Sequence, residues 1–134
     1  MQKASDRYPK TIYVDGSELS NGRYQVTIDN VPVALRPVSF KLFSLLSWHC
    51  RFGSPAHCGW IYNLELDPFD HTARYLFRLR TEIQPVIGWL WRVYENNYVG
   101  YYRLYARPKS ITLNLDNLKV FPDSAVSALV STVS

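Results

Sequence analysis

Arginine side chains recur between apolar residues in the segment RYLFRLRTEI, residues 74–83. A guanidinium group is a planar fork of N–H donors that can bond O6 and N7 of guanine, or a phosphate oxygen. Arg74 and Arg78 are four residues apart, so on a helix they lie one turn apart on the same face. The spacing makes this segment a candidate for contact with an anionic partner. A solvated helix face with incidental charge pairing is the alternative interpretation.

Two His-Cys pairs, His49-Cys50 and His57-Cys58, place four potential zinc ligands within ten residues. Neighbouring residues on a helix point about 100° apart, and the CxxC spacing typical of zinc sites is missing. A zinc site and a Cys50–Cys58 disulfide stay open as alternatives. Ordinary packing at a corner between helices is the favoured interpretation, and we expect no metal and no cofactor.

The remaining polar residues suit catalysis poorly. Acidic side chains are scattered through turns and helix starts, without a nucleophile, base and orienting group that the pattern would bring together. A glycine-rich phosphate loop is missing as well. Asp70-His71 reads more simply as the capping region of a helix. We therefore expect a protein that is not an enzyme and has no small-molecule substrate.

Composition sets the frame for these residues. The chain has 134 residues, 47% of them hydrophobic, which is enough for one sizeable core. No apolar run has the roughly 18 residues of a membrane span, and the polar start lacks the apolar stretch of a signal peptide. With only two cysteines, these features predict a cytoplasmic protein without a membrane partner. Fifteen basic against eleven acidic residues, a net charge of +4, are compatible with a polyanionic partner without requiring one.

The first part of the chain has the pattern of a small antiparallel sheet. Residues 1–10 are polar and unpatterned, which predicts a flexible N-terminus. Residues 11–35 alternate β-branched and aromatic residues with polar ones, interrupted by three pairs of turn formers. These pairs are Asp15-Gly16, Asn21-Gly22 and Asp29-Asn30.

Three helices are predicted after this sheet. Apolar residues recur at threes and fours from Pro37 until Gly53 ends the first helix. A second, shorter helix can be drawn through residues 55–66, although Gly59 weakens the pattern. The third begins near Asp67-Pro68 and is expected to end at Gln84-Pro85, because the residue before a proline leaves the helical region.

A hairpin is predicted next, in residues 89–106. Its two β-rich arms flank Asn96-Asn97, a pair that tolerates the positive φ of a tight turn. After it, the segment SITLNL reads as one possible strand, which could cap the sheet, pair with a partner or begin another unit. We expect a domain over residues 11–105 and a C-terminal extension over 106–134 that ends in a mobile tail.

The third helix has two distinct faces. Its apolar stripe, spaced four, three and four apart, is expected to face the core. The stripe consists of Thr72, Leu76, Leu79 and Ile83. A second row with similar spacing is expected on the opposite side, and it consists of His71, Arg74, Tyr75, Arg78 and Glu82.

Residues 24–105 resemble the effector domain of OmpR/PhoB-type transcription regulators. The resemblance lies in a strand pair leading to LRPVSFKLFSLLSWH, in FRLRTEI, which is similar to the family's Ile-x-Arg-Leu-Arg-x-Lys-Leu, and in VGYYRLY, which is similar to its closing Gly-Tyr-Arg-Leu. It implies an α+β fold, a winged helix-turn-helix with an N-terminal antiparallel sheet, three helices and a C-terminal β-hairpin wing. In such proteins the third helix enters the major groove, and the wing touches the backbone or the adjacent minor groove.

Roles for individual residues follow from this resemblance and from side-chain chemistry. Arg74 and Arg78 are placed to read guanine, and Tyr75 to contact a thymine methyl or a phosphate. Arg80 lies off the outer row and is expected to contact the phosphate backbone, whereas His71 belongs to that row. Ser54 and His57, at the start of the second helical segment, are expected to anchor the backbone.

The predicted wing departs from the family pattern. Asn97 stands where the family commonly has arginine, and Tyr98 stands where it has the first glycine. Asparagine can reach a minor-groove acceptor but brings no charge to the groove. Arg92 and Arg103 on the hairpin arms could meet phosphates, or could be ordinary exposed strand residues.

The predicted function is binding of double-stranded DNA in transcriptional regulation. Residues 70–103 hold five arginines against three acidic residues, so binding by a monomer should be weak and strengthened by dimerisation on repeated half-sites. The alternative is a winged helix used for protein contact or dimerisation. Its adhesive edge would consist of Tyr98, Tyr101, Tyr102 and Tyr105.

Overall fold

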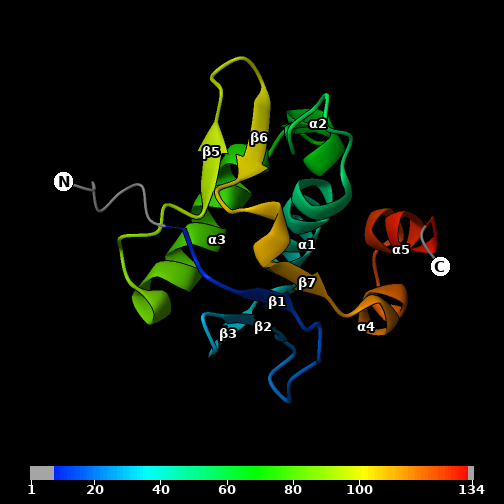
Figure 1. Ribbon diagram of the computed structural model, residues 1–134. Helices are drawn as coiled ribbons and strands as arrows, with labels where there is room; N and C mark the ends of the chain where they lie inside the picture. Colours follow the sequence, from blue (N-terminus) through cyan, green and yellow to red (C-terminus); the bar gives the residue numbers. More distant parts are fainter. Residues whose placement is uncertain (1–7, 133–134) are drawn as a thin grey trace.

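The computed structural model describes residues 8–132. It is an α+β structure in which two helices, α1 and α3, lie between a four-stranded sheet and a three-stranded sheet that carries a projecting hairpin (Figure 1). The α+β class agrees with the prediction. Within the described residues, no helix has the length and apolar character needed to traverse a bilayer.

The four-stranded sheet begins with β1 (Ile12–Val14), β2 (Tyr24–Ile28) and β3 (Val31–Leu35), which pair in antiparallel fashion as predicted. Asp29 and Asn30 join β2 to β3 with φ values of 50° and 68°, the tight turn that their residue types favour. A fourth strand, β7 (Ile111–Leu113), pairs with β1 in parallel. The sheet is therefore mixed, with the order β3-β2-β1-β7, rather than purely antiparallel.

The first helix, α1 (Pro37–Phe52), has the predicted bounds. Proline occupies its first position, where a missing N–H costs nothing, and Gly53 follows its end. Phe40, Phe43 and Leu46 are fully buried, because the helix packs against α3, β6 and β7. This helix is the centre of the core.

The predicted second helix over residues 55–66 is wrong for most of its length. Residues 55–59 form turns, β4 (Ile61–Tyr62) pairs with the hairpin, and only α2 (Asn63–Leu66) is helical. Cys58 and Gly59 have positive φ values of 50° and 83°, which interrupt a helix. Pairing of Ile61 with Tyr102 then favours the extended form for these β-prone residues.

The third helix, α3 (Thr72–Ile87), buries the predicted stripe: Thr72, Leu76, Leu79 and Ile83 are all fully buried. It begins later than Asp67, whose carboxylate accepts the N–H of His71 at 2.7 Å. It also continues through Pro85, so the predicted end at Gln84-Pro85 is wrong. Gly88 ends the helix instead, with φ 118° and its N–H donated to the Gln84 carbonyl.

The predicted hairpin is present as β5 (Tyr94–Asn96) and β6 (Tyr101–Leu104), in a sheet with the order β4-β6-β5. The positive φ values fall on Tyr98 (63°) and Gly100 (99°), not on Asn96 and Asn97 as predicted. The two asparagines contribute side-chain acceptors to the turn instead of its left-handed residues.

The C-terminal part, predicted as an extension after residue 105, shares the hydrophobic core of the rest. It begins with η2 (Pro108–Ser110), and the possible strand predicted in SITLNL is present as β7. The helices α4 (Leu115–Val120) and α5 (Ser124–Ser131) follow, where a mobile tail was predicted. Phe121 packs between Tyr24 and Phe40, with ring centroids 4.8 and 5.0 Å apart. At the other end, residues 1–7 of the predicted flexible N-terminus lie outside the described residues, and Tyr8 stacks on Tyr105 at 4.6 Å.

Candidate functional site

The outer face of α3 carries two exposed guanidinium groups. Arg74 and Arg78 point away from the buried stripe, since they lie about half a turn around the helix from it. The Arg74 side chain forms no hydrogen bond or ion pair with any described residue. The Arg78 guanidinium lies 5.8 Å from the Tyr75 ring and is not paired with a carboxylate in the described part of the chain. Both groups are therefore available to an external anion or base.

The predicted outer row of α3 is only partly present, because its two end residues, His71 and Glu82, lie in different surroundings. His71 is exposed, with Nδ1 3.7 Å from the Asp67 carboxylate and its ring edge-on to the half-buried Tyr75. Glu82 does not belong to this face, contrary to the prediction. It points toward the start of α1, where its carboxylate accepts the backbone N–H of Arg36 at 2.8 Å.

Phe77 is a member of this face that the sequence analysis did not identify. Its side chain is 62% exposed and lies on the outer side of α3 with Arg74 and Arg78. The signal was present in the sequence, because Phe77 falls outside the three-and-four spacing of the buried stripe. An exposed phenyl ring on the outer side of the helix gives the face an apolar contact as well as charge.

Arg80 holds α3 to the hairpin. Its Nε donates to the Arg92 carbonyl at 3.1 Å, and its guanidinium lies 4.2 Å from the Tyr94 ring centroid. The side chain is half-buried by these contacts. Arg80 thus fixes the relative placement of the helix and the hairpin.

The two arginines of the hairpin arms differ in their freedom. Arg92 is exposed, with its guanidinium 4.6 Å from the Tyr105 ring. Arg103 forms an ion pair with Glu95 at 3.3 Å, donates Nη1 to the Cys58 carbonyl at 3.3 Å and lies over the Trp60 ring. Arg103 is therefore used inside the protein, whereas Arg92 faces solvent.

Asn97 organises the hairpin turn. Its Oδ1 accepts the N–H groups of Val99 at 2.9 Å and Tyr101 at 3.0 Å. The Oδ1 atom is thereby engaged inside the protein, and the turn gains a fixed shape.

A groove of about 720 Å³ separates the C-terminal half of α3 from the hairpin. Basic and aromatic side chains dominate its walls, with Arg80 and Arg92 on the same groove as the aromatic residues. Its lining residues are Arg80, Gln84, Trp89, Leu90, Arg92, Tyr94, Glu95, Asn96 and Tyr98.

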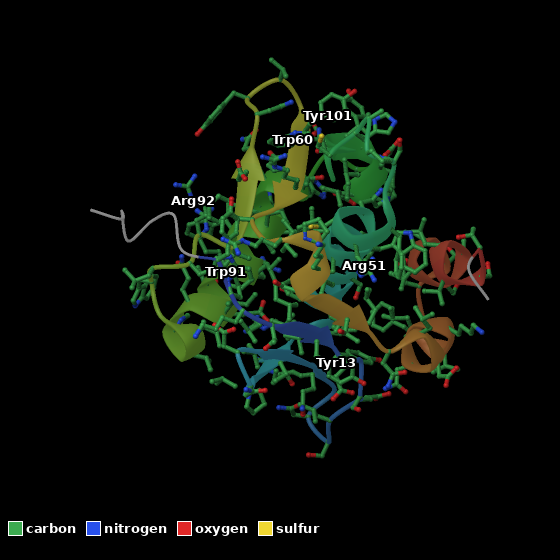
Figure 2. All side chains as sticks on the ribbon, in the orientation of Figure 1. Tyr13, Arg51, Trp60, Trp91, Arg92 and Tyr101 are labelled. Atoms are coloured by element: carbon green, nitrogen blue, oxygen red, sulfur yellow. The ribbon has the colours of Figure 1, made fainter. Side chains whose placement is uncertain are left out.

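Ser54 and His57 lie elsewhere. Both are exposed in the turn between α1 and β4, where the Ser54 carbonyl accepts the His57 N–H at 3.0 Å. They line a separate hollow with Trp60 and Tyr101, and this hollow shares no lining residue with the groove beside α3. Figure 2 shows Arg92 beside β5, away from Trp60 and Tyr101. Ser54 and His57 therefore do not line the groove that holds Arg80 and Arg92.

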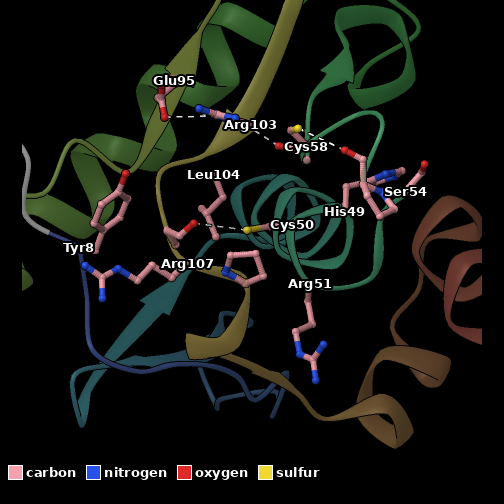
Figure 3. Close-up of a pocket in the computed structure, with 15 residues that line it drawn as sticks. Tyr8, His49, Cys50, Arg51, Ser54, Cys58, Glu95, Arg103, Leu104 and Arg107 are labelled. Atoms are coloured by element: carbon pink, nitrogen blue, oxygen red, sulfur yellow. Dashed lines mark hydrogen bonds and ion pairs between the residues drawn. The ribbon is translucent and has the colours of Figure 1, made fainter.

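The two cysteines line a pocket of about 580 Å³ beside the end of α1 (Figure 3). Both are free thiols: Cys50 donates to the Ala106 carbonyl and Cys58 to the Pro55 carbonyl. Burial raises the pKa of the Cys50 thiol and lowers the pKa of His49 next to it. Among residues 8–132, no three His, Cys, Asp or Glu side chains are grouped closely enough to hold a metal ion.

The tyrosine edge predicted for protein contact is smaller than expected. Tyr98 is 88% exposed and Tyr101 39% exposed, but Tyr102 is half-buried and Tyr105 is buried. Tyr105 is covered because Tyr8 stacks on its ring and Arg92 lies over it. Of the four predicted tyrosines, Tyr98 and Tyr101, in the distal part of the hairpin, are the exposed ones.

Comparison of the chain with protein-family models, with curated proteins and with solved structures found no match. The chemistry of the site therefore rests on its own geometry. A convex helix face offers two guanidinium groups and a phenyl ring, and beside it a basic and aromatic groove leads to an exposed hairpin tip. This combination suits a partner that presents phosphates and base edges along an extended surface.

Proposed function

We propose that this chain is a winged-helix domain of the OmpR/PhoB type that binds double-stranded DNA in transcriptional regulation. The main support for DNA binding is the position of Arg74 and Arg78. Both side chains are exposed opposite the buried stripe of α3, without a carboxylate partner among the described residues. The order of a sheet, three helices and a hairpin supports the same class. In this proposal α3 is the recognition helix and the β5–β6 hairpin is the wing.

Recognition would proceed from the outer face of α3 in the major groove. Arg74 and Arg78 each offer a bidentate fork to guanine O6 and N7, and the Phe77 ring suits a thymine methyl group. Arg92, exposed on the groove between α3 and the wing, is placed to neutralise a phosphate. Arg80 acts as a positioning residue, because its contacts fix the wing relative to α3.

The small number of free cations supports weak binding by one copy. With Arg103 paired to Glu95 and Arg80 bound to the hairpin, few guanidinium groups remain for phosphates. Two copies on repeated half-sites would add their binding free energies, so dimerisation on DNA is part of the proposal.

A second candidate function is protein contact through the same region. It is favoured by exposed apolar side chains near the groove, namely Trp89 at 71%, Tyr98 at 88% and Val99 at 74%. Aromatic residues are enriched at protein interfaces. A partner protein would use this apolar surface without needing Arg74 and Arg78.

Selection of bound sequences from a random duplex pool tests the proposal. Wild-type protein should enrich sites that contain guanine, and repeated half-sites if two copies bind. Arg78→Ala should lose about 1 to 3 kcal/mol of affinity for the enriched site and relax one position of it. Lys119→Ala, an exposed charge on α4, is the matched control and should leave the selection unchanged. A wild-type pool without enrichment would favour the protein-contact function instead.

A further inference from the structure

The tip of the hairpin presents apolar side chains to solvent. Tyr98 is 88% exposed, more than any other large hydrophobic residue of the described chain, and Val99 is 74% exposed. Tyr98 has no ring or cation contact with any described residue. Such exposure at the end of a projecting hairpin (Figure 1) marks a surface for a partner.

The tip is also held in one shape. Asn96 Oδ1 accepts the Tyr98 N–H at 2.7 Å, and Asn97 Oδ1 accepts the N–H groups of Val99 and Tyr101. Tyr98 has φ 63°, a left-handed conformation that bulky residues rarely adopt and that persists only where the surroundings impose it. The side chains of Asn96 and Asn97 therefore stabilise a turn in which a tyrosine occupies a left-handed position that glycine would adopt with less strain.

The tip lies on the path that DNA would follow. Tyr98 lines the same groove as Arg80 and Arg92, between α3 and the hairpin. When a recognition helix occupies the major groove, a wing reaches across one phosphate strand toward the next minor groove. This step rests on the proposed function. It places the phosphate strand along the groove and the tip at the minor groove.

The tip of the hairpin cannot bind a minor groove through basic side chains. Residues 96–101 contain no lysine or arginine. Apolar side chains act on a minor groove in another way, since they enter between base steps, unstack them and bend the duplex. The tip is also narrow, whereas a stable interface between proteins needs about 1,200 Å² or more.

We propose that Tyr98 and Val99 form an apolar wedge that enters the minor groove and bends bound DNA. Tyr98 supplies a flat ring that can stack on an unstacked base, and Val99 fills the space beside it. Binding would then depend on how easily a sequence deforms, in addition to the bases read by α3. Pyrimidine–purine steps such as TA should be preferred under the tip.

The test is energy transfer across a duplex of about 20 base pairs with a central TA step and a dye at each end. Wild-type protein should bind and increase the transfer, as expected for a bend of about 20 to 90°. The double variant Tyr98→Asn with Val99→Thr should still bind but lose the increase. Asparagine tolerates the left-handed conformation and threonine keeps the branched shape, so the turn is preserved. Val120→Ser, a change at an equally exposed valine on α4, is the matched control and should bend DNA like wild type.

Each result decides between the two proposals. Binding by wild-type protein without a change in transfer would overturn the wedge and leave DNA binding standing. A bend that persists in the double variant would overturn the wedge as well. Failure of wild-type protein to bind any duplex would overturn both. Loss of a dimer in the double variant, measured by sedimentation without DNA, would assign the tip to contact between copies.

Discussion

At the scale of single residues, Glu82 shows how one carboxylate can join two elements. From α3 it accepts the backbone N–H of Arg36 and the hydroxyl of Ser39 at the start of α1, and it lies 3.6 Å from Arg23, the residue before β2. Its side chain is 11% exposed. A negative charge at a helix N-terminus is favourable because it satisfies free N–H groups and the helix dipole.

We expect Glu82→Ala to lower the free energy of unfolding by about 1 to 3 kcal/mol, the cost of removing a charged acceptor from partly buried donors. Denaturant unfolding followed by circular dichroism measures the change. Glu65→Ala, an exposed change on α2, should alter stability by less than about 0.5 kcal/mol. Equal effects of the two variants would show that Glu82 does not join α3 to α1.

His49 should make stability depend on pH. Burial lowers its pKa from the ordinary 6.5, with Glu65 opposing and His57 reinforcing the change. The folded protein therefore binds fewer protons at this site than the unfolded chain. The free energy of unfolding should fall as pH drops below 6.5, before carboxylates begin to titrate. His49→Gln should flatten this slope, whereas His57→Gln, at an exposed position, should retain most of it. An unchanged slope in His49→Gln would contradict the assignment.

Residue types predicted the outer face of α3 only in part. The spacing of Leu76 and Leu79 fixes which side of the helix is buried, so Arg74 and Arg78 could be placed in advance. Glu82 could not, because the donors that it binds at the start of α1, Arg36 and Ser39, are distant in sequence. The same limit applies to Arg103, whose partner carbonyl on Cys58 is brought near only by the pairing of β4 with β6.

At the scale of elements, the hairpin is built around a turn that has little tolerance for change. A Cβ at Gly100 would lie 3.2 Å from the Tyr62 ring, and its φ of 99° disfavours other residues. Gly22 has φ 79° but open space around it. A substitution at Gly22 therefore introduces backbone strain alone, whereas one at Gly100 introduces backbone strain and a steric contact.

Gly100→Ala should destabilise the protein more than Gly22→Ala. Both changes carry the left-handed penalty of about 1 to 2 kcal/mol, and only the first also displaces Tyr62. Thermal unfolding of the two variants measures the difference. If Gly22→Ala were the more damaging, the packing of the hairpin against β4 would not be as described.

Elements with strong local signals were predictable, and those set by distant pairing were not. Turn pairs and alternation located β2 and β3, and Pro37 and Gly53 bounded α1. Residues 55–62 were assigned to a helix because spacing alone cannot reveal that Ile61 pairs with Tyr102. The predicted end of α3 at Gln84-Pro85 was wrong because Pro85 lies in the last turn, where its missing N–H costs little helical hydrogen bonding. Gly88 ends the helix instead.

At the scale of the whole molecule, the chain folds around one core to which both ends contribute. β7 pairs with β1 across almost 100 residues of sequence, with Ile111 opposite Ile12. Composition predicted a single core, but a short strand such as β7 could not be assigned a partner from its own residues. The C-terminal helices then cover the aromatic cluster of Tyr24, Phe40 and Phe121.

Phe121→Ala should lower the free energy of unfolding by about 3 to 5 kcal/mol, because it removes a buried ring and leaves a cavity. Its neighbour Val120 is 79% exposed, so Val120→Ala should have little effect. Denaturant unfolding of both variants is the measurement. Similar stability of the two would mean that the C-terminal segment adds nothing to the core.

The proposal that DNA lies across α3 and the hairpin is tested most directly by the affinity for duplex DNA as a function of salt concentration. If DNA lies across α3 and the hairpin, log affinity should fall linearly with log salt, with a slope of about −0.9 for each phosphate contacted. Arg92→Ala should make this slope shallower by about one contact, and Lys119→Ala should leave it unchanged. An affinity that does not vary with salt, or slopes that are the same for wild type and Arg92→Ala, would contradict the placement of DNA across α3 and the hairpin.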